Sequence, residues 1–324
     1  MITLEEIRNP VEHHIGIFEK KFYTYMKSSV PLLNVITRYL YRRKGKQMRP
    51  LFVFLSAGIS GEINESTYRA ASLIELLHTA TLVHDDVVDD SDERRGFFSI
   101  NALWKNKIAV LVGDYLLSRG LMIALEGKDY NLLEIVSNSV KQMSEGELLQ
   151  IEKARRLDIE EEIYFEIIRK KTASLISSCC ACGASSTGCS SDIVEKMRDF
   201  GEKVGIAFQI KDDLFDFDAG NKSGKPKGID IKDRKMTLPV IYMLSQMGTF
   251  EKREVIHAIK SRRINSHNVS KVIEKVNNSG GIEYAQARMI EYRDKALEIL
   301  HSFPESQSRD SLEKLVMFST ERNE

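Results

Sequence analysis

Apolar residues recur at spacings of three and four along most of this chain, and strand-like alternation is scarce. The clearest stripe consists of Leu73, Leu76, Leu77, Ala80, Val83 and Val87. A second amphipathic segment covers residues 163–168. Such spacing predicts α-helices with one buried face. No proline falls between Pro50 and Pro226, so nothing in that long stretch forces a helix to break.

Breaks between helices are predicted where glycine and polar residues cluster. These clusters are 58–61, 94–96, 127–129, 186–188 and a long loop from Asp218 to Lys235. The chain has no linker rich in proline, glycine or serine and no low-complexity tract. We therefore expect residues 1–324 to form a single all-α domain.

Composition narrows the class of protein. The chain has 324 residues and a 42% hydrophobic share, which is enough for a sizeable core. Lys plus Arg and Asp plus Glu both number 47, so no net basic charge attracts nucleic acid. No apolar run approaches the roughly 20 residues that span a bilayer, so we expect no transmembrane segment. Residues 1–10 lack an apolar signal core, and a cytoplasmic protein is expected.

The four cysteines lie close together at positions 179, 180, 182 and 189. Cys179 and Cys182 have the spacing of a metal or redox pair, but neither a second pair nor a histidine cluster lies nearby in the sequence. A zinc site is therefore not expected. We expect small apolar residues of a tightly packed helix among Ala181, Gly183 and Ala184 instead.

Two similar acidic motifs carry the strongest chemical signal. Asp85, Asp86 and Asp89 form one, and Asp212, Asp213 and Asp216 form the other, each in an apolar and proline-free context. On a helix, residues four apart share a face, so the first and last aspartate of each motif would project together. The alternative is two solvated acidic helix faces.

Crowded carboxylates repel one another and need cations. Mg²⁺ takes oxygen ligands and is usually held by one or two carboxylates together with substrate phosphates. Two acidic faces opposite each other could therefore hold a diphosphate through shared Mg²⁺.

Basic residues cluster near both acidic motifs in the sequence. Arg and Lys bind phosphate oxygens, and Arg often does so with two parallel hydrogen bonds. Any one of these residues could instead be a solvated surface charge. As a set they indicate two diphosphate sites, one bridged by metal and one without metal. They are Lys46, Arg49, Arg94, Arg95, Lys171, Lys225 and Lys235.

The motifs stand in an order that resembles the trans-isoprenyl diphosphate synthases, the polyprenyl synthetase family, from about residue 40 to residue 290. The resemblance is carried by 45–50 (GKQMRP), His78, 84–96 (HDDVVDDSDERRG), 112–114 (VGD), 146–150 (GELLQ), 171–172 (KT), 208–216 (FQIKDDLFD), 224–226 (GKP) and 235–239 (KMTLP). Class I terpene cyclases share the first aspartate motif, but usually have a different second motif.

The resemblance implies a fold of antiparallel helices around a deep central cavity, usually in a homodimer. It implies Mg²⁺-dependent prenyl transfer, in which isopentenyl diphosphate is condensed head to tail with an allylic diphosphate primer. About three Mg²⁺ ions per active site are implied when diphosphate is bound. The product is apolar, so delivery to a membrane is expected.

Carried over residue by residue, the family pattern assigns Asp85, Asp89 and Asp212 as Mg²⁺ ligands, supported by Asp86, Asp213 and Asp216. The allylic diphosphate would be bound by Arg94, Lys171, Thr172, Gln209, Lys225 and Lys235, with Lys171 also counted as catalytic. Isopentenyl diphosphate would be bound by Lys46, Arg49, His78 and Arg95. Two departures from the pattern exist, at Lys44–Gln47 and at Arg234, and the first could change the shape of that loop.

Product length is expected to depend on the residues that precede Asp85 on its helix. In the family, bulky aromatics at the positions of Ala80 and Thr81 go with short products, and here both residues are small. Leu77 and the residues before it would line the deeper path. We therefore expect a medium- to long-chain polyprenyl diphosphate synthase. The alternatives are a farnesyl or geranylgeranyl diphosphate synthase and a non-catalytic partner subunit.

Overall fold

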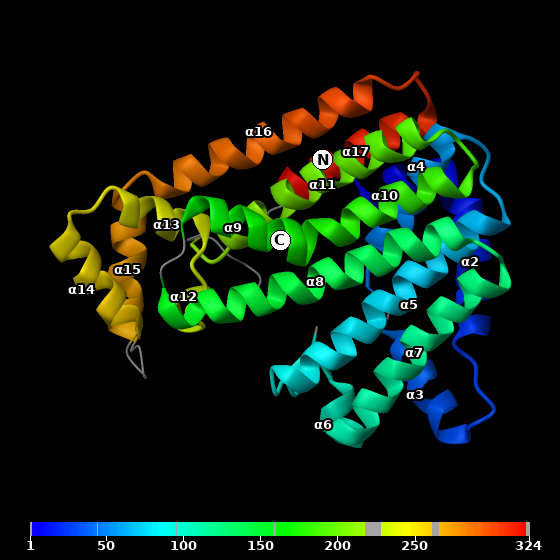
Figure 1. The fold of residues 1–324 in the computed structure, drawn as a ribbon, viewed down its shortest axis with the longest axis horizontal. Helices are drawn as coiled ribbons and strands as arrows, with labels where there is room; N and C mark the ends of the chain where they lie inside the picture. The colour runs from blue at the N-terminus through cyan, green and yellow to red at the C-terminus, as the bar shows by residue number, and fades with distance from the viewer. Residues whose placement is uncertain are drawn as a thin grey trace. The chain divides into compact units, whose positions relative to one another are not determined.

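The computed structural model describes residues 2–43, 45–94, 96–157, 160–217, 228–260 and 266–321. Helices dominate, and the strands within these residues are two two-residue segments, β1 (Glu93–Arg94) and β2 (Phe97–Phe98), paired antiparallel. The predicted all-α class is confirmed (Figure 1). Contacts divide the chain into two compact units, described separately below. The prediction of one domain over 1–324 remains a prediction.

Unit 1 comprises 1–137, 178–197 and 304–312. Its elements are α1 (Leu4–Arg8), the 3₁₀ turn η1 (Asn9–Val11), α2 (Glu12–Tyr25), α3 (Pro31–Arg42), α4 (Met48–Ser60), α5 (Glu65–Val88), β1, β2, α6 (Ile100–Trp104) and α7 (Asn106–Glu126). The helices α8 (Tyr130–Arg156), α10 (Ser174–Ser186), α11 (Ser191–Leu214) and α17 (Gln307–Glu321) cross the boundary between the units.

Helix α5 is the core of unit 1 and lies side by side with α7 (Figure 1). It begins with a capping box in which the Asn64 side chain accepts from the Ser66 N–H at 2.8 Å and the Thr67 hydroxyl accepts from the Asn64 N–H. These bonds satisfy N–H groups that a helix start would leave unpaired. Gly120 of α7 lies against Leu73, where a side chain would crowd the interface.

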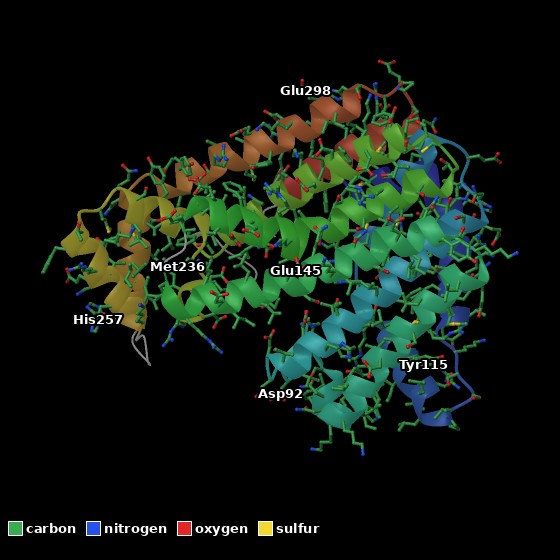
Figure 2. All side chains as sticks on the ribbon, in the orientation of Figure 1. Asp92, Tyr115, Glu145, Met236, His257 and Glu298 are labelled. Atoms are coloured by element: carbon green, nitrogen blue, oxygen red, sulfur yellow. The ribbon has the colours of Figure 1, made fainter. Side chains whose placement is uncertain are left out.

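Unit 2 comprises 138–177, 198–303 and 313–324. It contains α9 (Glu161–Ile168), the π-helical turn η2 (Arg169–Ala173), α12 (Ile229–Lys232), α13 (Leu238–Ser245), α14 (Thr249–Lys260), α15 (Ser266–Asn278) and α16 (Gly281–His301). In Figure 2, His257 marks α14 and Glu298 marks α16. A buried cluster that includes Ile206, Ile210 and Leu238 forms the hydrophobic core next to the second acidic motif.

Within the described residues, one helix, α7, is long and apolar enough to cross a membrane by length and composition alone. Its most apolar window has a mean hydropathy of 1.7, and 39% of that window is buried inside the protein.

Candidate active site

The first acidic motif lies at the end of α5, where one exposed pair of carboxylates flanks a buried carboxylate. Asp85 is in the last helical turn, and Asp89 is the C-cap residue, whose N–H donates to the Asp85 carbonyl at 2.8 Å. Both side chains are exposed, whereas Asp86 between them is 4% exposed. The helical turn therefore brings Asp85 and Asp89 to one place, as the spacing predicts.

Asp86 orders the segment that follows the motif. The Nε atom of Arg94 donates to Asp86 Oδ1 at 2.7 Å, and Asn101 donates to the main-chain oxygens of Asp86 and Ser91, both at 3.2 Å. Burial raises the pKa of the Asp86 carboxyl, and the bond from Arg94 opposes that rise. Arg94, which is predicted to bind the allylic diphosphate, forms an ion pair with Asp86 in this structure.

His84, just before the motif, joins α5 to α7. Its Nε2 atom lies 3.2 Å from the Val110 carbonyl oxygen and 3.5 Å from Asp114 Oδ1. A side chain at Gly113 would collide with the His84 ring, so only glycine fits at that position. This contact explains why the 112–114 motif has glycine at its centre. Asp114, to which no role was predicted, lies near the first acidic motif through its contact with His84.

The predicted isopentenyl diphosphate residues occupy neighbouring parts of unit 1. Lys46 is exposed in the segment ahead of α4, and Arg49 is half-buried in the first turn of α4. His78 is 8% exposed on α5, which packs against α4. Gln47, which lies between Lys46 and Arg49 in the sequence, has a left-handed backbone with φ of 52°. This conformation shapes the turn that leads into α4. Arg95 lies outside the described residues.

The second acidic motif belongs to unit 2 and has the same alternation of exposed and buried carboxylates. Asp212 is exposed on the last turn of α11, and Asp213 is 7% exposed. Asp213 accepts from the Tyr164 hydroxyl at 2.7 Å and from Gln209 Nε2 at 2.8 Å. Burial, followed by the charge of Asp230, raises the pKa of Asp213 to about 7.

Asp216 differs from the expected arrangement. Helix α11 ends at Leu214, so Asp216 lies beyond the regular helix that carries Asp212. Its carboxylate accepts instead from the N–H groups of Ile229 at 2.9 Å and Asp230 at 3.3 Å, at the start of α12. A carboxylate is favourable there because it satisfies unpaired helix N–H groups and complements the helix dipole.

The segment that carries Lys235 is held by acidic neighbours. Lys235 Nζ lies 3.6 Å from Asp230 Oδ1 and 3.8 Å from Asp233 Oδ2. Burial raises the pKa of Asp230, and the charge of Lys235 opposes this rise. The sequence predicts a long loop for this segment, and no motif in it points to Asp230. Lys225 lies outside the described residues.

Lys171 and Thr172 lie on the π-helical turn η2, a geometry that is rare and is often found at functional sites. Lys171 Nζ is 2.5 Å from Glu147 Oε2, and the Thr172 hydroxyl donates to Gln209 Oε1 at 2.7 Å. Two glycines admit this turn between neighbouring helices. A side chain at Gly146 would meet the backbone of Lys171, and one at Gly205 would meet that of Ala173.

Thr172, Gln209 and Asp213 therefore form one chain of hydrogen bonds that links η2 to the second motif. The sequence predicts roles for these three residues but not for Tyr164 and Glu147, which hold Asp213 and Lys171. Glu147 stood within a quoted motif, whereas Tyr164 looked like one more apolar position of an amphipathic helix.

The predicted chain-length residues lie on α5 before the first motif. Ala80 is 2% exposed and Leu77 is 1% exposed, whereas Thr81 is half-buried. The Thr81 hydroxyl donates to the His78 carbonyl at 2.9 Å. Their role in product length remains a prediction.

The cysteines behave as packed apolar residues. Cys179, Cys180 and Cys182 are buried, Cys189 is partly exposed, and none of the four forms a disulfide. Burial raises the pKa of Cys180 to about 12. Gly183, on the same helix, approaches the Val53 carbonyl so closely that a side chain would not fit. Among the residues that the structure describes, no group of three or more His, Cys, Asp or Glu could hold a metal ion by itself.

Residues 30–276 match the sequence profile of the Polyprenyl synthetase family. The octaprenyl diphosphate synthase of Escherichia coli (strain K12) is 33% identical over 323 residues, which cover 99% of this chain and 100% of that protein. A decaprenyl diphosphate synthase from Rhodobacter capsulatus has a crystal structure that is similar, with a TM-score of 0.93 at 32% identity, over 99% of this chain and 100% of that one.

A crystal structure of a polyprenyl synthase from Caulobacter crescentus CB15, in complex with calcium and isoprenyl diphosphate, has a TM-score of 0.90 at 31% identity. The match covers 99% of this chain and 98% of that one. The resemblance first carried by the acidic and basic motifs thus extends over nearly the whole chain and includes the fold. This chain belongs to the polyprenyl synthetase family.

Proposed function

We propose that this protein is an all-trans polyprenyl diphosphate synthase that depends on Mg²⁺ and adds isopentenyl diphosphate repeatedly to an allylic diphosphate primer. The observation that carries the proposal is the repeated pairing of carboxylates in a member of this family. Each motif places an exposed aspartate beside a buried, hydrogen-bonded one, Asp85 with Asp86 and Asp212 with Asp213. The exposed member faces solvent, and the buried member is held by its hydrogen bonds.

The donor set suits Mg²⁺. Asp85 and Asp89 offer carboxylate oxygens on one helical turn, and Asp212 offers another on α11. Mg²⁺ favours such hard oxygen ligands, and at each motif the carboxylates would hold it together with water and substrate phosphate oxygens. When bound, the metal would neutralise the diphosphate and stabilise the negative charge that develops as diphosphate leaves.

The proposed diphosphate-binding residues divide between the two substrates. Lys171 and Lys235 are held by Glu147 and Asp230, and with Arg94, Thr172, Gln209 and Lys225 they would bind the allylic diphosphate. Lys46, Arg49, His78 and Arg95 would bind isopentenyl diphosphate. Apolar surroundings would protect the allylic cation from water while the double bond of isopentenyl diphosphate attacks it. The released diphosphate is the proposed base for the final proton loss.

A medium- or long-chain product is proposed for two reasons. The relatives cited above are named as octaprenyl and decaprenyl diphosphate synthases. In addition, Ala80 and Thr81 offer little bulk one turn before Asp85. Both reasons favour elongation beyond farnesyl diphosphate.

A homodimer is also proposed, and α7 is the surface that supports it. Leu111, Met122 and Leu125 are 56%, 44% and 43% exposed and share one helix face with Ser118. The three apolar residues lie on one face that Ser118 interrupts. A second helix would cover these apolar positions, and a two-fold dimer would pair this face with itself. Sedimentation of the purified protein at micromolar concentration as a monomer would contradict this assignment.

The enzymatic proposal is tested by an assay with isopentenyl diphosphate and farnesyl diphosphate, with the products sized by chromatography. Asp85→Ala and Asp212→Ala should each lower turnover by on the order of 10²-fold, because each removes electrostatic stabilisation of the leaving diphosphate. Asp92→Asn is the matched control, since Asp92 is an exposed acid that follows the first motif closely (Figure 2). Wild-type turnover in the presence of EDTA would contradict metal dependence.

A further inference from the structure

A stack of three side chains holds the hairpin β1–β2 against the end of α3. The guanidinium carbon of Arg43 lies 3.9 Å from the centre of the Tyr39 ring and 3.9 Å from the centre of the Phe97 ring. Arg43 is the C-cap residue of α3, and Phe97 belongs to β2. Arginine binds well to the negative face of an aromatic ring, and here two rings share one guanidinium.

Tyr39 extends this contact to two further elements. Its hydroxyl donates to the Phe98 carbonyl at 2.6 Å, and its ring meets the edge of Trp104 at 5.3 Å between ring centres. Phe98 is the other residue of β2, and Trp104 is the last residue of α6. Tyr39 and Arg43, one helical turn apart on α3, therefore hold the second strand through both a side chain and a main-chain oxygen.

The hairpin needs such support because it is very short. Each strand has two residues, and an isolated two-stranded hairpin is at best marginally stable in water. Phe97 and Phe98 remain 49% and 57% exposed, so the hairpin is not buried in a core. Ser99 donates to the carbonyl oxygens of Ser91 and Asp92 at the base of the hairpin. The contacts from α3 and the Arg94 bond to Asp86 add to these bonds in fixing its position.

The stack connects two groups of proposed diphosphate-binding residues. Phe97 pairs across the hairpin with Arg94, whose Nε atom donates to Asp86 of the first acidic motif. On the other side, Arg43 closely precedes Lys46 and the first turn of α4 that carries Arg49. A displacement of Arg43 would reach both the hairpin and the segment that enters α4.

We propose that Arg43 is a positioning residue for prenyl transfer, which acts by stacking on Tyr39 and Phe97 and thereby fixes the hairpin that carries Arg94. This inference rests on the proposed function for its effect on the reaction. The stack itself is a separate physical claim with its own readout. Arg43 does not contact substrate in this role, and its charge matters less than its planar shape.

The test uses Arg43→Ala, Arg43→Lys and Phe97→Leu, with two matched controls. Arg42→Ala removes the neighbouring exposed arginine of α3, and Phe98→Leu removes the other exposed ring of the same strand. The first readout is the rate of limited trypsin cleavage in the hairpin after Arg94. This readout does not depend on any prenyltransferase activity of the protein. The second is the fluorescence of Trp104, the only tryptophan in the chain. The third is KM for each substrate together with kcat.

We expect faster hairpin cleavage and altered Trp104 emission in Arg43→Ala, Arg43→Lys and Phe97→Leu, with both controls close to wild type. KM for both substrates should rise, with about a 10-fold loss of kcat/KM and little change in kcat, because each variant removes the planar stacking of a guanidinium between two rings. Combining Arg43→Ala with Phe97→Leu should add little to either change alone, since both remove one shared contact.

Three results would overturn the proposal. Hairpin cleavage in Arg43→Ala equal to that in Arg42→Ala would show that no stack holds the hairpin. Full rescue by Arg43→Lys would show that a positive charge is sufficient without planar stacking. Unchanged kinetics despite a loosened hairpin would exclude a positioning role. If wild type lacked prenyltransferase activity, the proposed function would fail, and trypsin cleavage and fluorescence would still decide whether the stack exists.

Discussion

Gln209 donates a 2.8 Å hydrogen bond from Nε2 to Oδ1 of Asp213, one turn further along α11. An amide can do this only if its oxygen points the other way, and that oxygen accepts the Thr172 hydroxyl at 2.7 Å. Thr172 thus fixes the orientation of Gln209, and Gln209 holds the buried carboxylate of the second motif. Hydrogen bonds thus link η2 to the residue directly after Asp212.

The first prediction concerns this chain of hydrogen bonds. Thr172→Val keeps the side-chain shape but removes the donor, so Gln209 can turn and release Asp213. We expect KM for the allylic diphosphate to rise about 2- to 10-fold, the range of a lost hydrogen bond, with a smaller change for isopentenyl diphosphate. Thr172→Ser keeps the hydroxyl and should behave as wild type. Equal kinetics of the valine and serine variants would contradict a role for the hydroxyl.

The sequence was sufficient to predict the helical class and the two acidic motifs, because helical periodicity and aspartate spacing are local properties. The same local reasoning did not predict the contacts of Asp216. Helix α11 ends at Leu214, and the Asp216 carboxylate accepts two N–H bonds at the start of α12. Capping partners thirteen and fourteen residues away leave no periodic signal.

Tyr164 and Arg43 were missed for a related reason. Tyr164 occupies an apolar position of α9, and only the structure shows that its hydroxyl reaches Asp213, which is 49 residues away. Arg43 belongs to no motif in the sequence, and only the structure places its guanidinium over the Phe97 ring. Residues that bind substrate occur in recognisable motifs, whereas residues that position them depend on tertiary contacts.

The second prediction separates the two diphosphate sites. His78 is buried on α5, which packs against the helix that carries Arg49. His78→Ala should raise the apparent KM for isopentenyl diphosphate far more than that for the primer, because it removes a proposed ligand of one substrate only. Initial-rate kinetics with each substrate varied in turn measure the difference. An equal effect on both substrates, accompanied by a lower Tm, would instead indicate a packing residue.

The third prediction concerns pH and stability in unit 1. The His14 ring is stacked near Phe54, and its Nδ1 atom is 2.7 Å from the Tyr68 hydroxyl. Burial lowers the pKa of His14 below its ordinary value of 6.5, and His13 lowers it further. The unfolded chain then binds more protons than the folded one below pH 6.5, so stability is lost as the pH falls through that range.

Urea unfolding at several pH values between about 5 and 8 measures this loss of stability. His14→Gln should reduce the difference in unfolding free energy between the acidic and neutral ends of the range. The exposed His257, on α14, provides the matched control as His257→Gln (Figure 2). If the two variants had the same pH dependence, the acid sensitivity would not come from His14.

The last prediction tests product length at Ala80. A growing chain must extend away from the metal-binding carboxylates, and Ala80 is a small, buried residue of the helix that ends in Asp85. Ala80→Phe should fill the path and shift products toward farnesyl or geranylgeranyl length while the first condensation continues. Overpacking would also cost about 1–3 kcal/mol of stability, so the Tm is measured in parallel. Thr79→Phe adds the same ring to the adjacent position, which faces a different direction on the helix, and should leave the product length unchanged. An active Ala80→Phe enzyme with the wild-type product distribution would show that the chain does not pass this residue, and the proposal of a long product would then lose its main structural support.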